Sequence, residues 1–243
     1  MLADVFTYLT SADNWSGPNG IGSLLVEQLL LTFTALLLAL VIGLPPALYL
    51  GHRHRGGVVA VNVSNIGRAV PTFALLAVLV AADWPGAAQL GPYGRAGLAT
   101  LIALVLFALP PVITNAFVGV VEVDRGAVES ARGMGMSERQ LFRSVELPLA
   151  MPVVLTGIRL ALVQVWATAT IAALVAGPGL GRIITRGFAN HRTHEVVAGA
   201  LLVAVGALLL EGISVLGERY GDPMRRARRQ PTQKGNAAVG GRG

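Results

Sequence analysis

Five long apolar runs dominate the sequence and leave little polar chain between them. They extend over about residues 24–50, 58–82, 97–120, 149–176 and 196–216. A helix needs about 20 residues at ~1.5 Å rise to cross a hydrocarbon core of ~30 Å, and each run reaches that length. A soluble protein would have to bury all of them, yet only 13% of the residues are charged and 53% are hydrophobic. The sequence therefore predicts an all-α polytopic membrane protein with five spans.

The apolar runs divide the chain into three parts. Residues 1–22 precede the first run, and their lack of positive charge and of an apolar core argues against a cleavable signal peptide, so we expect the chain to keep them. Leu2, Val5, Phe6 and Leu9 follow helical spacing, which favours a short amphipathic helix on the membrane surface; a frayed terminus is the alternative. Residues 23–218 form the predicted transmembrane domain. Residues 219–243 form a basic tail that we expect to be disordered and to contact anionic lipid.

Arginine is unevenly distributed between the connecting segments, and this predicts the orientation. With the N-terminus outside, the cytoplasmic segments hold most of the positive charge: Arg53, Arg55, Arg125, Arg132, Arg139, Arg143 and the tail from Arg219 onward. The outer segments hold only Arg95, Arg182, Arg186 and Arg192. We therefore expect the N-terminus and residues 1–22 outside and the C-terminus in the cytoplasm. The positive net charge of +6 is then explained by the orientation of the spans and by contact with lipid headgroups. No nucleic-acid partner is predicted.

Motifs for catalysis or cofactor binding are absent from the sequence or in the wrong context. The chain has no cysteine and no G-x-x-x-x-G-K-[ST] sequence, so it cannot hold ATP in a P-loop. Gly177, Gly179 and Gly181 follow an apolar run instead of a strand, which favours a tight turn over a dinucleotide site. His191, His194 and Glu195 match no zinc motif, so we interpret them as solvated loop residues and predict no metal site. The chain is therefore predicted to be neither an enzyme nor a metalloprotein.

The segment between the third and fourth runs, residues 124–148, has the clearest local signals. Asp124 is suited to cap a short helix that extends to Met134, and Gly135 is suited to the left-handed conformation that ends it. Ser137 and Gln140 form a capping box for a second short helix, and Pro148 marks entry into the fourth span. An apolar stripe on this second helix would either pack on the protein's own bundle or enter a groove of a partner. The stripe consists of Leu141, Phe142 and Val145.

This segment resembles the E-A-A, three residues, G, nine residues, I-x-L-P loop of permease subunits in binding-protein-dependent ABC importers. Ser130 replaces the middle alanine and Val145 the isoleucine. The resemblance implies a type I importer permease fold in the bacterial inner membrane, with this loop as the coupling helix that docks on a separate ATPase subunit. The residues to which it assigns ATPase coupling are Glu129, Ala131, Gly135, Leu141, Phe142, Val145, Leu147 and Pro148.

The resemblance also implies the partners and a substrate class. The partners would be an ATP-binding subunit that uses ATP and Mg, an extracytoplasmic substrate-binding protein, and a second permease copy or a paralogue. Residues 65–80, 108–137 and 157–188 are similar to permeases for the osmoprotectants glycine betaine, choline, carnitine and proline betaine. A permease for methionine or another amino acid is the alternative. Two further alternatives are a structural membrane protein without transport and a membrane-embedded enzyme. Neither would account for the presence of a coupling loop.

A few polar or helix-breaking residues lie inside the apolar runs and are candidates for a translocation path. Arg68 precedes Pro71, which is expected to kink the second span, and an intramembrane arginine is costly unless it faces a wet cavity or a partner. The other candidates can equally be explained by hydrogen bonds between helices. The predicted path comprises Arg68, Pro71, Asn115, Gln164, Thr168 and Thr170. Arg159 is expected in the inner half of the fourth span, where it pairs with Glu129 or Glu146 or extends to the lipid headgroups. Trp166 is expected to be packed or lipid-facing, with contact to a quaternary ammonium as the alternative.

Overall fold

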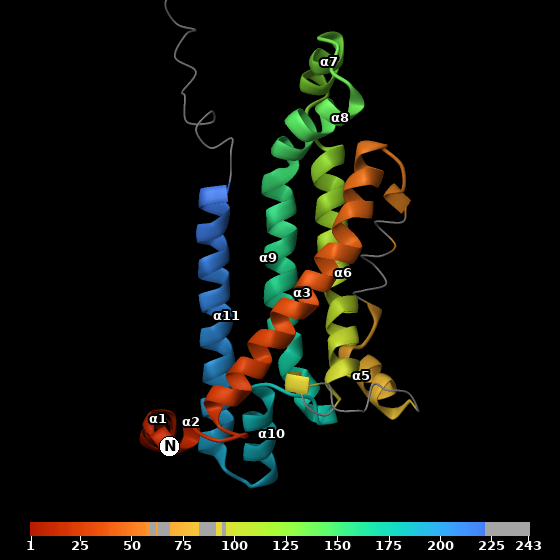
Figure 1. The fold of residues 1–243 in the computed structure, drawn as a ribbon. Coiled ribbons are helices and arrows are strands. Elements are labelled where there is room, and N and C mark those ends of the chain that lie inside the picture. Colours follow the sequence, from red (N-terminus) through yellow and green to blue (C-terminus); the bar gives the residue numbers. More distant parts are fainter. Residues whose placement is uncertain (59–61, 63–68, 83–90, 94–95, 222–243) are drawn as a thin grey trace, which may run out of the picture.

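A computed structural model describes residues 1–58, 62, 69–82, 91–93 and 96–221, and all of their regular elements are helical (Figure 1). The α-helices are α1 (Leu2–Thr10), α2 (Ala12–Trp15), α3 (Ile21–His52), α5 (Thr72–Ala81), α6 (Gly97–Val121), α7 (Arg125–Gly133), α8 (Glu138–Leu141), α9 (Leu147–Ile171), α10 (Gly181–Ala189) and α11 (Thr193–Gly221). Shorter turns are η2 (Gly91–Tyr93), the π-helical η3 (Phe142–Glu146) and η4 (Ala172–Val175). The helix predicted near the N-terminus is present as α1. Arg68 and residues 222–243 of the predicted tail lie outside the described residues.

Four helices in the described part of the chain are long and apolar enough to cross a membrane. They are Ile21–His52, Gly97–Val121, the continuous helix Glu138–Val175, and Thr193–Glu218. These helices coincide with the first, third, fourth and fifth predicted spans. The helical predictions for these four runs are therefore confirmed.

The second predicted span is only partly described, and its described part differs from the prediction. Here α5 has 10 residues, or ~15 Å, which is too short to cross a membrane alone. The helix begins directly after Pro71, whose backbone is extended (φ −65°, ψ 117°), so Pro71 interrupts the helix and does not merely kink it. Proline has no N–H to donate and it disfavours helical geometry in the preceding residue, which explains the interruption.

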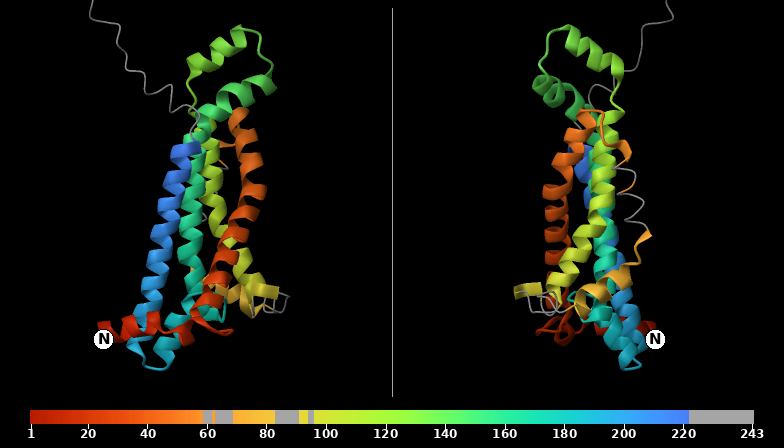
Figure 2. Two further views of the ribbon diagram at one scale, coloured as in Figure 1. Left: turned by 60° about the vertical axis from the view of Figure 1, so that its left-hand side comes forward. Right: turned by 90° about the vertical axis from the view of Figure 1, so that its right-hand side faces the viewer.

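The directions of the helices nevertheless require an odd number of crossings. α3 and α6 both run from the end of the molecule that holds α1 to the end that holds α7, as Figures 1 and 2 show. The chain between His52 and Gly97 therefore returns to the end where α3 began. α9 then runs down and α11 up, so α1 and the end of α11 lie at opposite ends of the bundle. This topology agrees with five crossings.

The long helices approach each other closely at small residues. A Cβ atom added to Gly43 would lie 2.9 Å from Leu109 of α6, and one added to Gly119 would lie 3.1 Å from Val153 of α9. At Gly157 in α9 it would lie 2.8 Å from the Pro111 carbonyl oxygen of α6. Because lipid tails are as apolar as the side chains, such close backbone packing is a main source of stability between membrane helices.

Candidate functional site

The loop between α6 and α9 projects beyond the bundle as a compact, well-capped unit. The Asp124 carboxylate accepts a hydrogen bond from the Ala127 N–H at 2.8 Å and caps α7, as predicted. α7 ends at Gly133, and Gly135 has a φ of +83°, which is the predicted left-handed conformation. The Met136 N–H donates to the Ala131 carbonyl at 3.2 Å, which completes a Schellman motif. The two arms of the loop therefore have a defined angle set by Gly135.

The second arm of the loop differs from the predicted separate helix. The capping box of Ser137 and Gln140 is present and starts α8. However, α8 continues through the π turn η3 into α9, so that one helix extends over Glu138–Val175. In η3 the Leu147 N–H donates to the Phe142 carbonyl, five residues back, directly before Pro148. Because Pro148 cannot donate, the α-helical bonding pattern must be interrupted here, and the π turn accommodates this without ending the helix.

Contacts of His52 hold the second arm against the end of α3, and one of them joins its Nε2 atom to a carboxylate oxygen of Glu138 at 3.5 Å. The His52 Nδ1 atom lies 2.5 Å from an oxygen of the Glu146 carboxylate, which is only 2% exposed. The His52 ring also packs edge-to-face on Phe142, with 5.4 Å between the ring centres. No local pattern in the sequence indicates this link. Only the tertiary structure brings residues so distant in the chain together.

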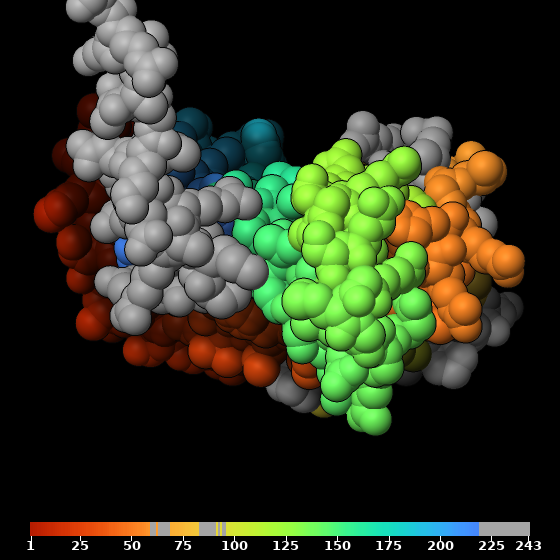
Figure 3. All heavy atoms as spheres, turned by 90° about the horizontal axis from the view of Figure 1, so that it is seen from above, coloured from red at the N-terminus to blue at the C-terminus, as the bar shows by residue number. Residues whose placement is uncertain are grey.

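The predicted coupling residues lie on two different faces of the loop. Leu141 and Ala131 are buried, and Val145 and Phe142 are partly buried, so the apolar stripe packs on the protein's own bundle. Glu129 is exposed, and Met134 is exposed to 73%. Viewed from this end, residues of α7 and α8 lie beside the end of α3 (Figure 3). The exposed surface of the loop also carries Arg125, Arg132, Arg139 and Arg143.

A cavity of about 660 Å³ lies among α5, α6, α9 and α11, and it contains part of the predicted path. Asn115 and Gln164 line it, as do Val70 and Thr72 on either side of Pro71. Gln164 Nε2 donates to the Phe107 carbonyl at 3.3 Å, and Asn115 Nδ2 to the Pro111 carbonyl at 2.8 Å. Pro71, Thr168 and Thr170 are not among the lining residues, and Arg68 lies outside the described residues.

An acidic residue that sequence analysis missed, Glu211 of α11, also lines the cavity. Arg159 of α9 contacts it, with 3.6 Å between Nε and Oε1, and contacts Glu218 with 3.2 Å between Nη1 and Oε2. The prediction that Arg159 pairs with Glu129 or Glu146 is therefore wrong, because α11 packs beside α9 and presents two carboxylates seven residues apart on one face. The signal was present in the sequence, since Glu211 interrupts the last apolar run.

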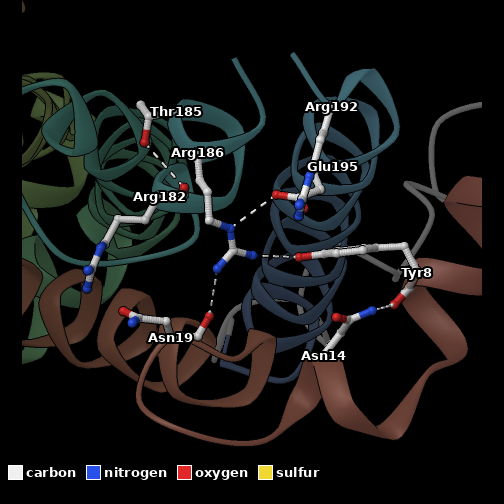
Figure 4. A network of polar contacts seen from close by, with 8 residues as sticks. All are labelled: Tyr8, Asn14, Asn19, Arg182, Thr185, Arg186, Arg192 and Glu195. Carbon is white, nitrogen blue, oxygen red and sulfur yellow. Dashed lines mark hydrogen bonds and ion pairs between the residues drawn. The ribbon is translucent and has the colours of Figure 1, made fainter. Parts of the chain in front are cut away.

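At the opposite end of the bundle, a polar network joins α1, α10 and α11 (Figure 4). The Glu195 carboxylate is paired with Arg186 at 3.1 Å and Arg192 at 2.9 Å. Arg186 also donates to the Tyr8 hydroxyl oxygen at 2.7 Å, and burial raises the pKa of Tyr8. The interpretation of Glu195 as a solvated residue is wrong, because only 3% of it is exposed. The described residues contain no group of metal ligands.

The glycine-rich segment after α9 forms the predicted tight turn, and polar side chains of α3 hold it. Gly179 has a φ of +105°, and its N–H donates to the Glu27 carboxylate at 3.1 Å. Gln28 is fully buried, accepts from the Leu180 N–H at 3.2 Å, and donates to the Trp166 carbonyl at 2.9 Å. Trp166 is packed, as predicted.

Residues 35–219 match the family described as the inner membrane component of binding-protein-dependent transport systems. The chain is 33% identical to the carnitine transport permease protein OpuCB of Listeria monocytogenes, over 76% of this chain and 80% of that protein. It is 32% identical to the choline transport system permease protein OpuBD of Bacillus subtilis, over 83% of this chain and 85% of that protein.

A solved structure, the MetNI methionine ABC transporter in an inward-facing conformation, contains a chain with a similar fold. The TM-score is 0.67 at 22% identity, and the match covers 80% of this chain and 93% of that chain. At this level of identity the similarity concerns the fold alone.

Proposed function

The chain belongs to the family of inner membrane components of binding-protein-dependent transport systems, and we propose that it is the permease of an ATP-driven importer for a quaternary-amine osmoprotectant. As a member of this family it is a multi-pass transport protein of the inner membrane and not an enzyme. The proposed substrate class rests on the sequence identity of this chain to permeases named for carnitine and choline. Glycine betaine belongs to the same chemical class, and one further relative is named for all three compounds.

ATP hydrolysis takes place in a separate partner subunit, which also holds ATP and Mg²⁺, and the loop at residues 124–148 couples it to this chain. Three features support this role: the loop projects, its two arms are capped, and its exposed surface carries Met134 and several arginines. Because α8 continues into α9, a push on the loop is transmitted directly to a helix that lines the cavity. Leu141 and Phe142 contribute by anchoring the second arm, while exposed residues such as Glu129 and Met134 contact the ATPase.

The end of the bundle with α7 faces the cytoplasm in this proposal. Arg53, Arg55 and the four arginines of the loop lie at or near that end. At the other end, the described residues carry fewer arginines, namely Arg182, Arg186 and Arg192. The positive-inside rule therefore favours α1 and α10 outside, where a substrate-binding protein delivers its ligand.

The cavity among α5, α6, α9 and α11 is part of the translocation path, and a second permease copy or a related permease closes it. Asn115, Gln164 and Glu211 line the cavity, and polar groups at this depth are costly when they face lipid. A second chain with its own cavity would enclose a polar path between the two. Pro71, Thr168 and Thr170 stay candidates with an indirect role, since none of them lines the cavity. Arg68 lies outside the described residues and stays a candidate for the path.

Reconstitution in proteoliposomes with the partner ATPase and binding protein tests the proposed function. We expect ATP-dependent uptake of labelled carnitine, choline or glycine betaine, and no uptake when the ATPase carries a variant that cannot hydrolyse ATP. ATP-dependent uptake of methionine, with none of the three amines, would contradict the proposed substrate class.

A further inference from the structure

The three charged residues shared by α9 and α11 do not balance. Among the described side chains of this cluster Arg159 is the single cation, and it contacts the two carboxylates of Glu211 and Glu218. Both helices are long enough to cross the membrane; Glu218 ends the apolar helix Thr193–Glu218, whereas Glu211 lies seven residues inside it and Arg159 lies near the middle of α9. An unbalanced charge at such a depth is costly unless it faces a wet cavity or meets a counter-ion, so an ionisable residue there indicates a functional site.

The two carboxylates have different surroundings. The Oε2 atom of Glu218 lies 3.2 Å from Nη1 of Arg159, and the Glu218 side chain is 24% exposed. Its other oxygen, Oε1, is buried without a hydrogen-bond partner. The Oε1 atom of Glu211 lies farther from Arg159, at 3.6 Å from Nε, and the Glu211 side chain is 43% exposed. Glu211 also lines the cavity. Arg159 is thus closer to Glu218 than to Glu211, so the excess negative charge lies at Glu211, in the wall of the cavity.

The rest of the cavity wall suits a small organic cation. Its volume of about 660 Å³ is within the range of small-molecule sites, about 300–1,000 Å³. Phe107 adds an aromatic side chain, and Leu160, Val163 and Ala167 add apolar surface for methyl groups. Gln164 and Asn115 add amides that can contact a hydroxyl or carboxylate at the other end of the ligand. The cavity lies near the middle of α6, where Pro110 and Pro111 form part of its wall.

We propose that Glu211 is the cation-recognition residue of a transient substrate site in this cavity, where its carboxylate contacts the quaternary ammonium group during translocation. This inference rests on the proposed function and adds a recognition residue to it. A quaternary ammonium has no N–H to donate, so charge attraction and apolar contact are the interactions that can hold it. Both are present in the wall around Glu211. Such a site is expected to be weak, because the substrate must leave it again.

The test measures transport and coupling in the reconstituted complex with its ATPase and binding protein. We expect Glu211→Gln to reduce the initial rate of choline uptake about tenfold or more, the factor expected for loss of one close ionic contact. ATP hydrolysis stimulated by loaded binding protein should stay near the wild-type rate, because the loop and its anchors are unchanged. Glu211→Asp, which keeps the charge, should recover much of the uptake.

Glu218→Gln is the matched control, because it removes the same charge from the triad and leaves the carboxylate in the cavity. We expect its loss of uptake to be several-fold smaller. Wild-type uptake by Glu211→Gln, or equal losses in Glu211→Gln, Glu211→Asp and Glu218→Gln, would overturn the inference and show that the triad only holds α9 to α11. If the wild-type complex itself carries no quaternary amine, the proposed function fails instead.

Should Glu211→Gln not assemble, binding of labelled choline to the wild-type complex without binding protein gives a second measurement. Competition by tetramethylammonium, and its absence for the neutral isostere 3,3-dimethylbutanol, would support a site for the cationic group. Equal competition by both compounds, or no choline binding at millimolar concentration, would contradict it.

Discussion

Among single residues, Gly135 shows how a backbone conformation can determine the geometry of the loop between α6 and α9. Its φ of +83° sets the angle between the arms of the loop, and no atom lies within 4 Å of a Cβ placed there. A side chain at this position therefore has room, and its cost comes from the backbone alone. That cost is roughly 1–2 kcal/mol for an L-residue in the left-handed region.

We expect Gly135→Ala to relax this turn, to tilt α7 relative to α8, and to weaken the stimulation of ATP hydrolysis by loaded binding protein. Gly133→Ala is a matched control, since Gly133 also has nothing within 4 Å of an added Cβ but lies in the helix α7 without a positive φ. It should be neutral or slightly stabilising. Equal ATPase stimulation in both variants would show that the angle at Gly135 does not matter for coupling.

At the scale of elements, the link between His52 and Glu146 joins the end of the first span to the π turn. Glu146 is 2% exposed, and its partner His52 is the last residue of α3. Removing one partner of a buried pair leaves the other without compensation, which typically costs about 3–5 kcal/mol. The π turn and α8 are therefore the part of the loop that depends on α3.

We expect His52→Ala to release α8 and η3 locally, seen as faster amide hydrogen exchange over residues 138–146, with α7 less affected. His54→Asn serves as the control. His54 is exposed with a φ of 49°, which asparagine tolerates. Unchanged exchange in His52→Ala would mean that packing of Leu141 and Phe142 alone holds the arm. Glu146→Gln should cost less than His52→Ala, because a neutral amide can still hydrogen-bond to the imidazole.

For the whole molecule, the proposed orientation can be tested directly because the chain has no cysteine. Asn190, at the end of α10, and Gly133, at the end of α7, are both exposed and lie at opposite ends of the bundle. An impermeant thiol reagent added to intact cells should label Asn190→Cys and leave Gly133→Cys unlabelled until the cells are permeabilised. If only Gly133→Cys is labelled in intact cells, the orientation is the opposite of the proposed one.

Much of this protein follows from local patterns in the sequence. The long spans could be predicted because hydrophobic length is a property of each segment by itself. The cap at Asp124, the turn at Gly135 and the capping box at Ser137 could be predicted because each involves residues within one or two turns. The family resemblance rests on the same kind of short, regularly spaced motif, which is why the sequence alone singles out residues 124–148 as the candidate coupling loop.

Tertiary structure decided whatever depends on which helices are neighbours. Arg159 pairs with Glu211 and Glu218, and His52 with Glu146, because α11 packs beside α9 and the end of α3 reaches the loop. Thr168 and Thr170 share a helix with Gln164, but their positions on it leave them outside the cavity wall. A polar residue in an apolar run indicates that it needs a partner, because lipid provides none. The sequence determined that need and the span in which it arises, and the packing of the helices determined the partner.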